Sequence, residues 1–333
     1  MKSASISTLI PLVLIAACSG DNGFTDPGPD NNPAPTGFSI TPANGMQVAQ
    51  VAYESVLTSG DMAGLTGSTG LTAGTAGGMS KPTMNTQFGG ILGHLIQNVP
   101  LPPVEQICGL GPGTVTVTFD VVDPLVFATG VLSAGDTILV EYVDCDEGFG
   151  EVLDGTIDFT VDAFTGDLLI TGLFDMTMTM NLIDFQVAFG ADVLTSNGDA
   201  TASLNNLAAP FVSASVSGSS MTTDTNSSSE VLTNYASSQT IDAALAYTMD
   251  ASGTLNSSQL TGAIAYSMPV MFEGVDVNYP NVGELLVTAE TGSARLIAQE
   301  NGVDVHIEIY SSTDGTGEPE QTIMTTWAEL AGT

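Results

Sequence analysis

Residues 174–182 read Phe-Asp-Met-Thr-Met-Thr-Met-Asn-Leu, so apolar and polar side chains alternate along the whole stretch. Successive side chains of a β-strand point to opposite faces, and a strict period of two therefore indicates one buried face and one wet face. A wet face is typical of antiparallel sheets, because parallel sheets are covered on both sides. This stretch predicts a half-buried antiparallel strand.

The same period recurs from residue 114 almost to the end of the chain. Gly, Asn, Asp and Ser cluster between the runs, and Asn197-Gly198 and Asn301-Gly302 are typical of hairpin turns. No helical pattern separates the runs, which excludes a parallel α/β fold. We therefore predict a mainly β fold, a long antiparallel meander whose twist curls it into a barrel or half-barrel. Its alternating runs are 115–121, 138–142, 157–161, 174–182, 185–189, 200–204, 212–216, 241–249, 264–268, 285–289, 295–298 and 303–309.

Two short helices are expected before the strands. Asn44 is a typical N-cap for a helix over residues 46–57, where apolar side chains recur at helical spacing. A second helix is expected over residues 86–98, with five apolar side chains on one face. Both helices would pack on the sheet, so we expect a single domain over residues 38–333 with a helical part at 38–104.

The N-terminus has the pattern of an export signal. Lys2 precedes an apolar run over residues 6–17 that is too short to span a bilayer, and small residues lead into Cys18. Residues 19–37 carry Gly, Pro, Asp and Asn with little that is apolar, so they are expected to form a disordered tether.

The four residues Ile15-Ala16-Ala17-Cys18 resemble the lipobox of bacterial lipoproteins. The resemblance implies a signal peptide at 1–17, a diacylglycerol on the sulfur of Cys18 and acylation, for instance by palmitate, of the new amino terminus. Ser19 stands where the inner-membrane retention signal of that family usually has Asp, which implies the outer membrane. The alternative is an ordinary signal peptide with a coincidental cysteine.

A second set of residues is scattered over the chain, namely Cys18, Asn44, Gly135-Asp136 before Cys145, Tyr279-Pro280, Gly283, Gly292-Ser293 and Trp327. With these residues the chain resembles uncharacterised lipoproteins of the bacterial cell envelope. The resemblance rests on scattered residues and carries no activity to transfer. The architecture is also similar, as a fold-level analogy, to the open-sided β-barrels of lipoprotein-carrier proteins.

The charge balance excludes one class of partner. The net charge is −34, although only 12% of the residues are charged, against about 25% in typical proteins. After loss of the signal only Lys81 and Arg295 would oppose 37 acidic residues. Such a surface repels phosphate, so we expect no nucleic-acid binding.

Cys108 and Cys145 would remain as an even pair in an oxidising compartment, which predicts a disulfide. Two buried thiols are the alternative. A redox-active pair is not expected, because the chain has no Cys-x-x-Cys motif.

Two acidic loops offer oxygen ligands for Ca²⁺, and a plain solvated turn is the alternative for each. Neither loop fits the EF-hand pattern. The first is the better candidate, because a disulfide would fix the residues around Cys145. Its candidate ligands are Asp144, Asp146, Glu147 and Asp154, with Glu151 nearby, and the second loop contains Asp314, Glu318 and Glu320.

Catalytic motifs are sparse. His94 lies on an apolar helical face and is expected to be a packing residue. His306 shares one strand face with Asp304 and Glu308, which would suit a metal, although a solvated face is the simpler reading. Gly-x-Ser-x-Gly and Walker-type motifs are absent. We therefore expect no enzyme.

Three functions remain open. The first is a binding module for an apolar, lipid-like molecule, in which Met176, Met178 and Met180 would form an adaptable lining. The second is a structural or surface-interaction protein with a filled core that contacts another envelope protein. The third is an envelope hydrolase that uses carboxylates. In each case the membrane would be reached through the lipid anchor.

Overall fold

The computed structural model describes residues 37–64, 104–108, 112–146, 151–168, 170–189, 192–209, 211–226, 228–275 and 279–331. All of them belong to one compact unit, Asn32–Thr333.

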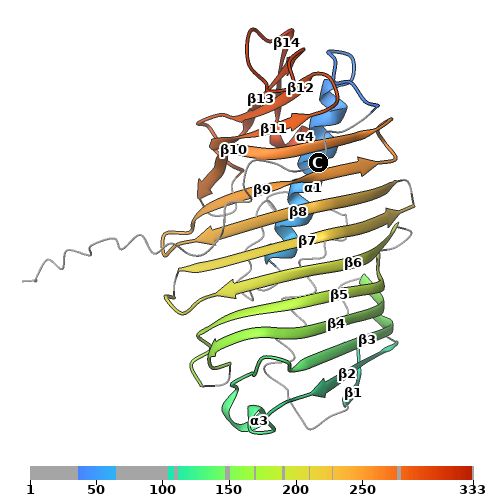
Figure 1. Cartoon of the computed structure of the whole chain (residues 1–333), viewed down its shortest axis with the longest axis vertical. Coiled ribbons are helices and arrows are strands. Elements are labelled where there is room, and N and C mark those ends of the chain that lie inside the picture. The colour runs from blue at the N-terminus through green and yellow to red at the C-terminus, as the bar shows by residue number, and fades with distance from the viewer. Residues whose placement is uncertain are drawn as a thin grey trace, which may run out of the picture. The chain divides into compact units, whose positions relative to one another are not determined.

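The described residues form a single antiparallel sheet of fourteen strands whose spatial order equals their order in the chain (Figure 1). The predicted mainly β meander is therefore confirmed. No pairing within the described ranges joins the first strand to the last, so the sheet is open. The strands are β1 Val104–Ile107, β2 Thr114–Asp120, β3 Thr137–Asp146, β4 Glu151–Gly166, β5 Phe174–Phe189, β6 Asp192–Asn205, β7 Val212–Thr225, β8 Ser229–Ile241, β9 Ala246–Ser257, β10 Ala263–Val275, β11 Val282–Thr288, β12 Ser293–Ala298, β13 Asp304–Tyr310 and β14 Gln321–Thr326.

One long helix accompanies the sheet. Helix α1, Gly45–Gly64, begins directly after Asn44 and contains the expected stretch 46–57. The second expected helix, 86–98, lies outside the described residues, so the pair of helices stays a prediction. Two four-residue helices, α3 Val126–Thr129 and α4 Trp327–Leu330, follow β2 and β14. None of the helices in the described part of the chain has the length and apolar character needed to cross a bilayer.

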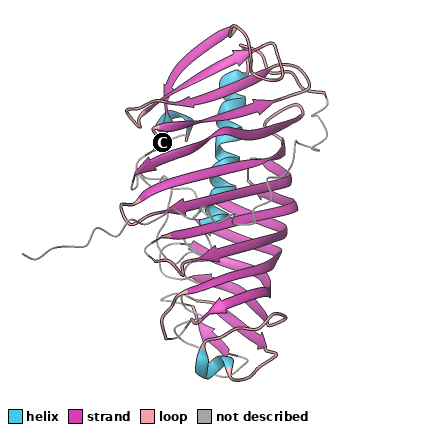
Figure 2. Cartoon of the chain, turned by 60° about the vertical axis from the view of Figure 1, so that its left-hand side comes forward, coloured by secondary structure: helices cyan, strands magenta, loops and turns pink. Residues whose placement is uncertain are grey.

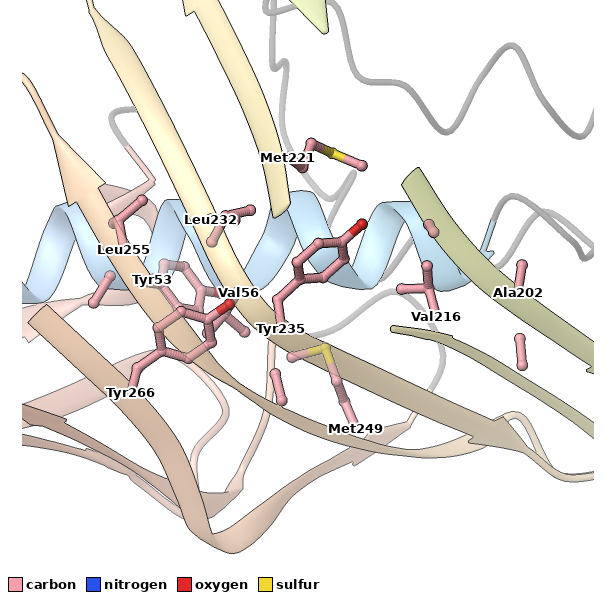
Figure 3. Packing of buried hydrophobic residues seen from close by; sticks show 14 of the residues in the cluster. Tyr53, Val56, Ala202, Val216, Met221, Leu232, Tyr235, Met249, Leu255 and Tyr266 are labelled. Carbon is pink, nitrogen blue, oxygen red and sulfur yellow. The ribbon is translucent and has the colours of Figure 1, made fainter. Parts of the chain in front are cut away.

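Helix α1 crosses several strands (Figure 2) and packs against β7, β8 and β9, and further along against β11, β12 and β13. We call this face of the sheet the inner face. The helix buries small side chains such as Val48, Ala49 and Ala52, which permit a close approach. Figure 3 shows Tyr53 and Val56 of α1 within the same apolar cluster as the inward side chains of the strands.

Three β-bulges bend the strands. Asp144 in β3, Asp184 in β5 and Asn234 in β8 have φ angles of 47°, 46° and 46°, and the pairing register shifts at each of them. Each is followed by a buried side chain that returns to the inner face, as Phe185 and Tyr235 do. Asp and Asn tolerate this left-handed conformation better than other residues with a side chain, and bulges increase the local bend and twist.

One of the two hairpin turns predicted from the sequence is wrong. Asn197-Gly198 was expected to be a hairpin turn, but both residues lie inside β6. The Asn197 side chain accepts a hydrogen bond from the backbone N–H of Asp184 at 2.7 Å, so it supports the bulge in β5. Gly198 has φ 147°, and a Cβ there would lie 2.5 Å from the Ser220 carbonyl oxygen. Glycine is required here by the close approach of neighbouring backbone.

Two further connections test the turn predictions. Asn301-Gly302 does lie in the turn that joins β12 to β13, although this connection is longer than two residues. The run 241–249 was expected to be one strand, which is wrong, because a turn separates β8 from β9 after Ile241. The Asp242 carboxylate accepts the N–H groups of Ala244 and Ala246 at 2.7 and 2.9 Å and thereby fixes the turn.

Glycines on the inner face lie beneath aromatic rings of the neighbouring strand. Gly218 of β7 is paired with Tyr235 of β8, and Gly253 of β9 is paired with Tyr266 of β10. A Cβ on Gly253 would lie 2.9 Å from the Tyr266 hydroxyl oxygen, and a Cβ on Gly218 would clash with the Tyr235 ring. The Tyr235 hydroxyl extends beyond Gly218 and donates a hydrogen bond to the Asp199 carbonyl at 3.1 Å.

We expect Gly218→Ala to destabilise the protein by about 1–3 kcal/mol, because the new methyl group overpacks the space that Tyr235 fills. Urea unfolding followed by circular dichroism measures the change. The exposed neighbour Ser217 provides the control, since Ser217→Ala should change the free energy of unfolding by less than about 0.5 kcal/mol. Equal effects of the two variants would contradict the packing argument.

Candidate functional site

The predicted disulfide is present. Cys108, directly after β1, is bonded to Cys145 in β3, with 5.2 Å between the two Cα atoms, and both side chains are buried. The link joins the edge strand β1 to β3 across β2. It therefore holds the end of the sheet at which the bulge residue Asp144 lies.

The structure describes only some of the candidate calcium ligands. The carboxylate of Asp154 in β4 accepts the backbone N–H of Asp144 at 3.3 Å, so the bulge already uses one carboxylate. Asp146 ends β3 opposite Val152. Glu147 lies outside the described residues. No group of three possible ligands gathers in the part of the chain that is described, and calcium binding stays a prediction.

On the outer face of β13, the two carboxylates beside His306 accept hydrogen bonds from other residues. The carboxylate of Asp304 accepts the side-chain amide of Asn301 at 2.7 Å. Glu308 accepts the hydroxyl of Tyr310. Both carboxylates therefore serve the turn and the strand surface, and the three side chains form no metal cluster of the kind considered from the sequence.

The second acidic loop is organised by its own hydrogen bonds. Asp314 accepts the hydroxyl and the backbone N–H of Thr316 at 2.8 and 3.1 Å. These bonds stabilise the carboxylate and lower the pKa of Asp314. Glu318 and Glu320 do not join it in a metal-binding group, and His94 lies outside the described residues.

The inner face holds the most distinctive surface, an apolar tract on β4, β5 and β6. Met178 pairs with Val161 of β4 and Ala202 of β6, and Met180 pairs with Phe159 and Ala200. Side chains of directly paired residues lie on the same face. We call the set Phe159, Val161, Met176, Met178, Met180, Ala200 and Ala202 the methionine tract, and every member is buried.

A row of polar side chains interrupts the apolar inner face beside this tract. Ser196 of β6 pairs with Thr223 of β7, Thr223 pairs with Glu230 of β8, and Glu230 pairs with Ser257 of β9. We call these four residues the polar row. The Ser257 hydroxyl donates to the Glu230 carboxylate at 3.3 Å. The Ser196 and Thr223 hydroxyls are buried and have no hydrogen-bond partner.

Sequence reasoning missed the polar row, although a signal was present. Each of its members stands two positions from a large apolar residue of the same strand, where the period of two demands another apolar side chain. The alignment of the four polar residues becomes visible only when the strands are placed in register, and the sequence does not give that register. The four apolar neighbours are Leu194, Met221, Leu232 and Leu255.

Comparison with known proteins gives no assignment. No protein-family model, no curated protein and no solved structure matches this chain.

Removing the disulfide should weaken the fold strongly. We expect the double variant Cys108→Ala, Cys145→Ala to lose about 4 kcal/mol of unfolding free energy, since closure of a 37-residue separation no longer restricts the unfolded chain. Urea unfolding of the oxidised wild type, the reduced wild type and the variant measures this loss. The reduced wild type should match the variant. A wild type that is indifferent to reductant would contradict the prediction.

Proposed function

We propose that this chain is a lipid-anchored protein of the bacterial cell envelope, attached to the outer membrane through Cys18. The lipobox-like residues Ile15-Ala16-Ala17-Cys18 support the anchor. The disulfide between Cys108 and Cys145 supports export, because such bonds persist in oxidising compartments. Two acyl groups suffice for stable anchoring, whereas one gives only marginal membrane binding.

We further propose that the folded unit binds an apolar, lipid-like molecule on the methionine tract. The observation that carries this proposal is the extent of the apolar inner face. Helix α1 packs against β7, β8, β9 and β11 to β13, while the tract lies on β4, β5 and β6. A bound apolar molecule would be shielded from water there.

The side chains of the tract explain how a ligand would enter. They are buried by the protein itself, so a ligand has to part them. Methionine is unbranched and has three rotatable bonds, which lets Met178 and Met180 change rotamer at small cost. Ala200 and Ala202 opposite them occupy little volume. An apolar lining of this kind supports binding of an apolar molecule.

A structural or surface-interaction role is the second candidate, and the irregular strand β10 favours it. The register shifts twice around Val270, next to Pro269, which cannot donate a ladder hydrogen bond. Val270 and Met271 are 46% and 48% exposed. Exposed apolar side chains at an interrupted strand would suit contact with another envelope protein.

Lipidation is tested by substitution of the anchor residue. We expect Cys18→Ser to abolish incorporation of an alkyne-tagged palmitate during growth and to remove the protein from the outer-membrane fraction. Mass spectrometry of the N-terminal peptide identifies the modification. The Cys108→Ala, Cys145→Ala variant should keep the label. A wild-type chain that carries no acyl group would overturn the anchor.

Ligand binding is tested on the methionine tract. Native mass spectrometry and solvent extraction of the purified wild type should reveal a co-purified apolar molecule. We expect Ala202→Leu, which fills space opposite Met178, to lower its occupancy about ten-fold, a change of about 1.4 kcal/mol. Thr201→Leu places the same side chain on the exposed outer face and should leave occupancy unchanged. A wild type without any bound molecule would favour the structural role.

A further inference from the structure

The connections at one edge of the sheet carry most of the exposed large apolar side chains. Because neighbouring strands are antiparallel and follow the order of the chain, the connections β2–β3, β4–β5, β6–β7, β8–β9, β10–β11 and β12–β13 all lie at the same edge (Figure 1). Of the sixteen exposed large apolar side chains among the described residues, ten lie in these connections or at the strand ends beside them. We call six of them, one for each connection, the apolar rim: Leu125, Ile170, Leu207, Leu245, Val282 and Val303.

The opposite edge of the sheet has a different character. Its described connections contain none of these sixteen side chains. The longest of them, residues 311–320 between β13 and β14, contains Asp314, Glu318 and Glu320 and no large apolar residue. Apolar side chains are therefore gathered at one edge instead of being scattered singly over the surface, which is typical of an interaction surface.

Local hydrogen bonds hold the rim residues in place although their side chains are exposed. In four of the six connections an Asp or Asn side chain accepts the backbone N–H of the rim residue itself, and such bonds stabilise a turn. The pairs are Asp123 and Leu125 at 2.9 Å, Asp167 and Ile170 at 2.6 Å, Asn205 and Leu207 at 3.1 Å, and Asn301 and Val303 at 3.0 Å. The exposed apolar side chains are thus parts of ordered turns.

One rim residue is present in spite of backbone strain. Leu245 lies in the β8–β9 turn with a φ angle of 61°, and its side chain is 49% exposed. Glycine or asparagine adopts this left-handed conformation at a lower cost, and an exposed leucine gains little burial within the chain. The turn alone therefore does not explain a leucine here, whereas a contact outside the folded chain does.

The spacing of the rim favours a lipid surface over a protein partner. Neighbouring strands lie about 4.8 Å apart, so successive rim residues follow at about 10 Å and the six extend over about 50 Å along the sheet. The core of a protein interface is a contiguous and closely packed patch. Side chains so far apart would each need a separate pocket in a protein, whereas the apolar phase of a bilayer accepts them one by one.

The charges of the connections indicate how such a contact would be made. The six connections, residues 121–136, 167–173, 206–211, 242–245, 276–281 and 299–303, contain no Lys or Arg. Attraction between basic side chains and anionic lipids therefore does not come from this edge. The contact has to depend on insertion of apolar side chains, which uncharged and zwitterionic lipid surfaces permit equally well.

The length of the chain allows the rim and the anchor to reach the same bilayer. Gly37 donates its backbone N–H to the Glu290 carboxylate, so it is held at the opposite edge, where β11 connects to β12. Strand β12 has six residues and spans about 20 Å. The eighteen residues between Cys18 and Gly37 can reach about 60 Å when extended. They are long enough to pass the sheet.

We propose that the apolar rim inserts into the surface of the lipid bilayer to which Cys18 anchors the chain. This inference rests on the proposed lipid anchor and adds the edge of the sheet that contacts the membrane. It does not depend on the methionine tract.

The test measures lipid contact at single positions of the full-length, acylated protein in phosphatidylcholine vesicles. The fluorophore nitrobenzoxadiazole is attached to a cysteine in the rim, Ile170→Cys, or at the opposite edge, Thr313→Cys. Both positions are exposed, and the native Cys108 and Cys145 are bonded to each other. We expect lipids with a nitroxide on the acyl chain to lower the fluorescence at position 170 at least about two-fold and to leave position 313 unchanged.

Variants assign this contact to the rim as a whole. Removal of three other rim side chains should lower the quenched fraction at position 170 about five-fold, since insertion strength scales with the buried apolar area. Removal of three exposed apolar side chains outside the rim is the matched control and should change nothing, and circular dichroism verifies that both variants are folded. The rim variant is Leu125→Ser, Leu207→Ser, Leu245→Ser, and the control is Val143→Ser, Ile183→Ser, Met324→Ser.

The outcomes separate the rim from the anchor. If the chain floats with the vesicles but position 170 is quenched only by iodide in the water, the anchor stands and the rim is overturned, with a protein partner as its remaining use. Equal effects of the two triple variants overturn the rim as well. A chain that carries no acyl group overturns the anchor, and quenching at position 170 by added vesicles then decides the rim by itself.

Discussion

The packing around Trp327 is the contact on which the placement of α1, and with it the inner face, depends. The indole is fully buried, and its ring centroid lies 4.9 Å from that of Tyr53 in α1 and 5.4 Å from that of Phe272 in β10. Tyr279 stacks on it at 6.5 Å, and the indole N–H donates to the Pro280 carbonyl at 3.2 Å. The C-terminal helix therefore fixes the N-terminal helix against the sheet.

Once α1 is fixed, the strands beneath it have to leave room for it. The sheet meets this demand with glycine and alanine on the inner face and with aromatic rings from neighbouring strands that cover the glycines, as Tyr235 covers Gly218. Bulges at Asp144, Asp184 and Asn234 supply the bend that a flat strand cannot provide. The same device appears in three strands, so curvature is built into the backbone rather than imposed by the helix alone.

The sequence was sufficient for features that depend on local periodicity. The alternation at 174–182 identified a strand, the fold class followed from its repetition, and the even pair of cysteines indicated the disulfide. The sequence was insufficient where the same local pattern is compatible with two different structures. Asn197-Gly198 has the composition of a turn, yet the pair supports the bulge in β5. Its role depends on the neighbouring strands, because Asn197 accepts a hydrogen bond from Asp184 of β5 and Gly198 lies against the backbone of β7.

The candidate site shows the same limit at longer range. Met178 and Met180 were visible as an apolar row because they lie in one strand. Ser196, Thr223, Glu230 and Ser257 come from four strands, and only the register brings them into line. Burial of two unpartnered hydroxyls among apolar side chains opposes folding, whereas apolar residues at the same positions would not. Regular alternation over fourteen strands keeps most of the inner face apolar, and the buried, unpartnered hydroxyls of Ser196, Thr223 and Ser237 are exceptions that the period of two along one strand does not predict.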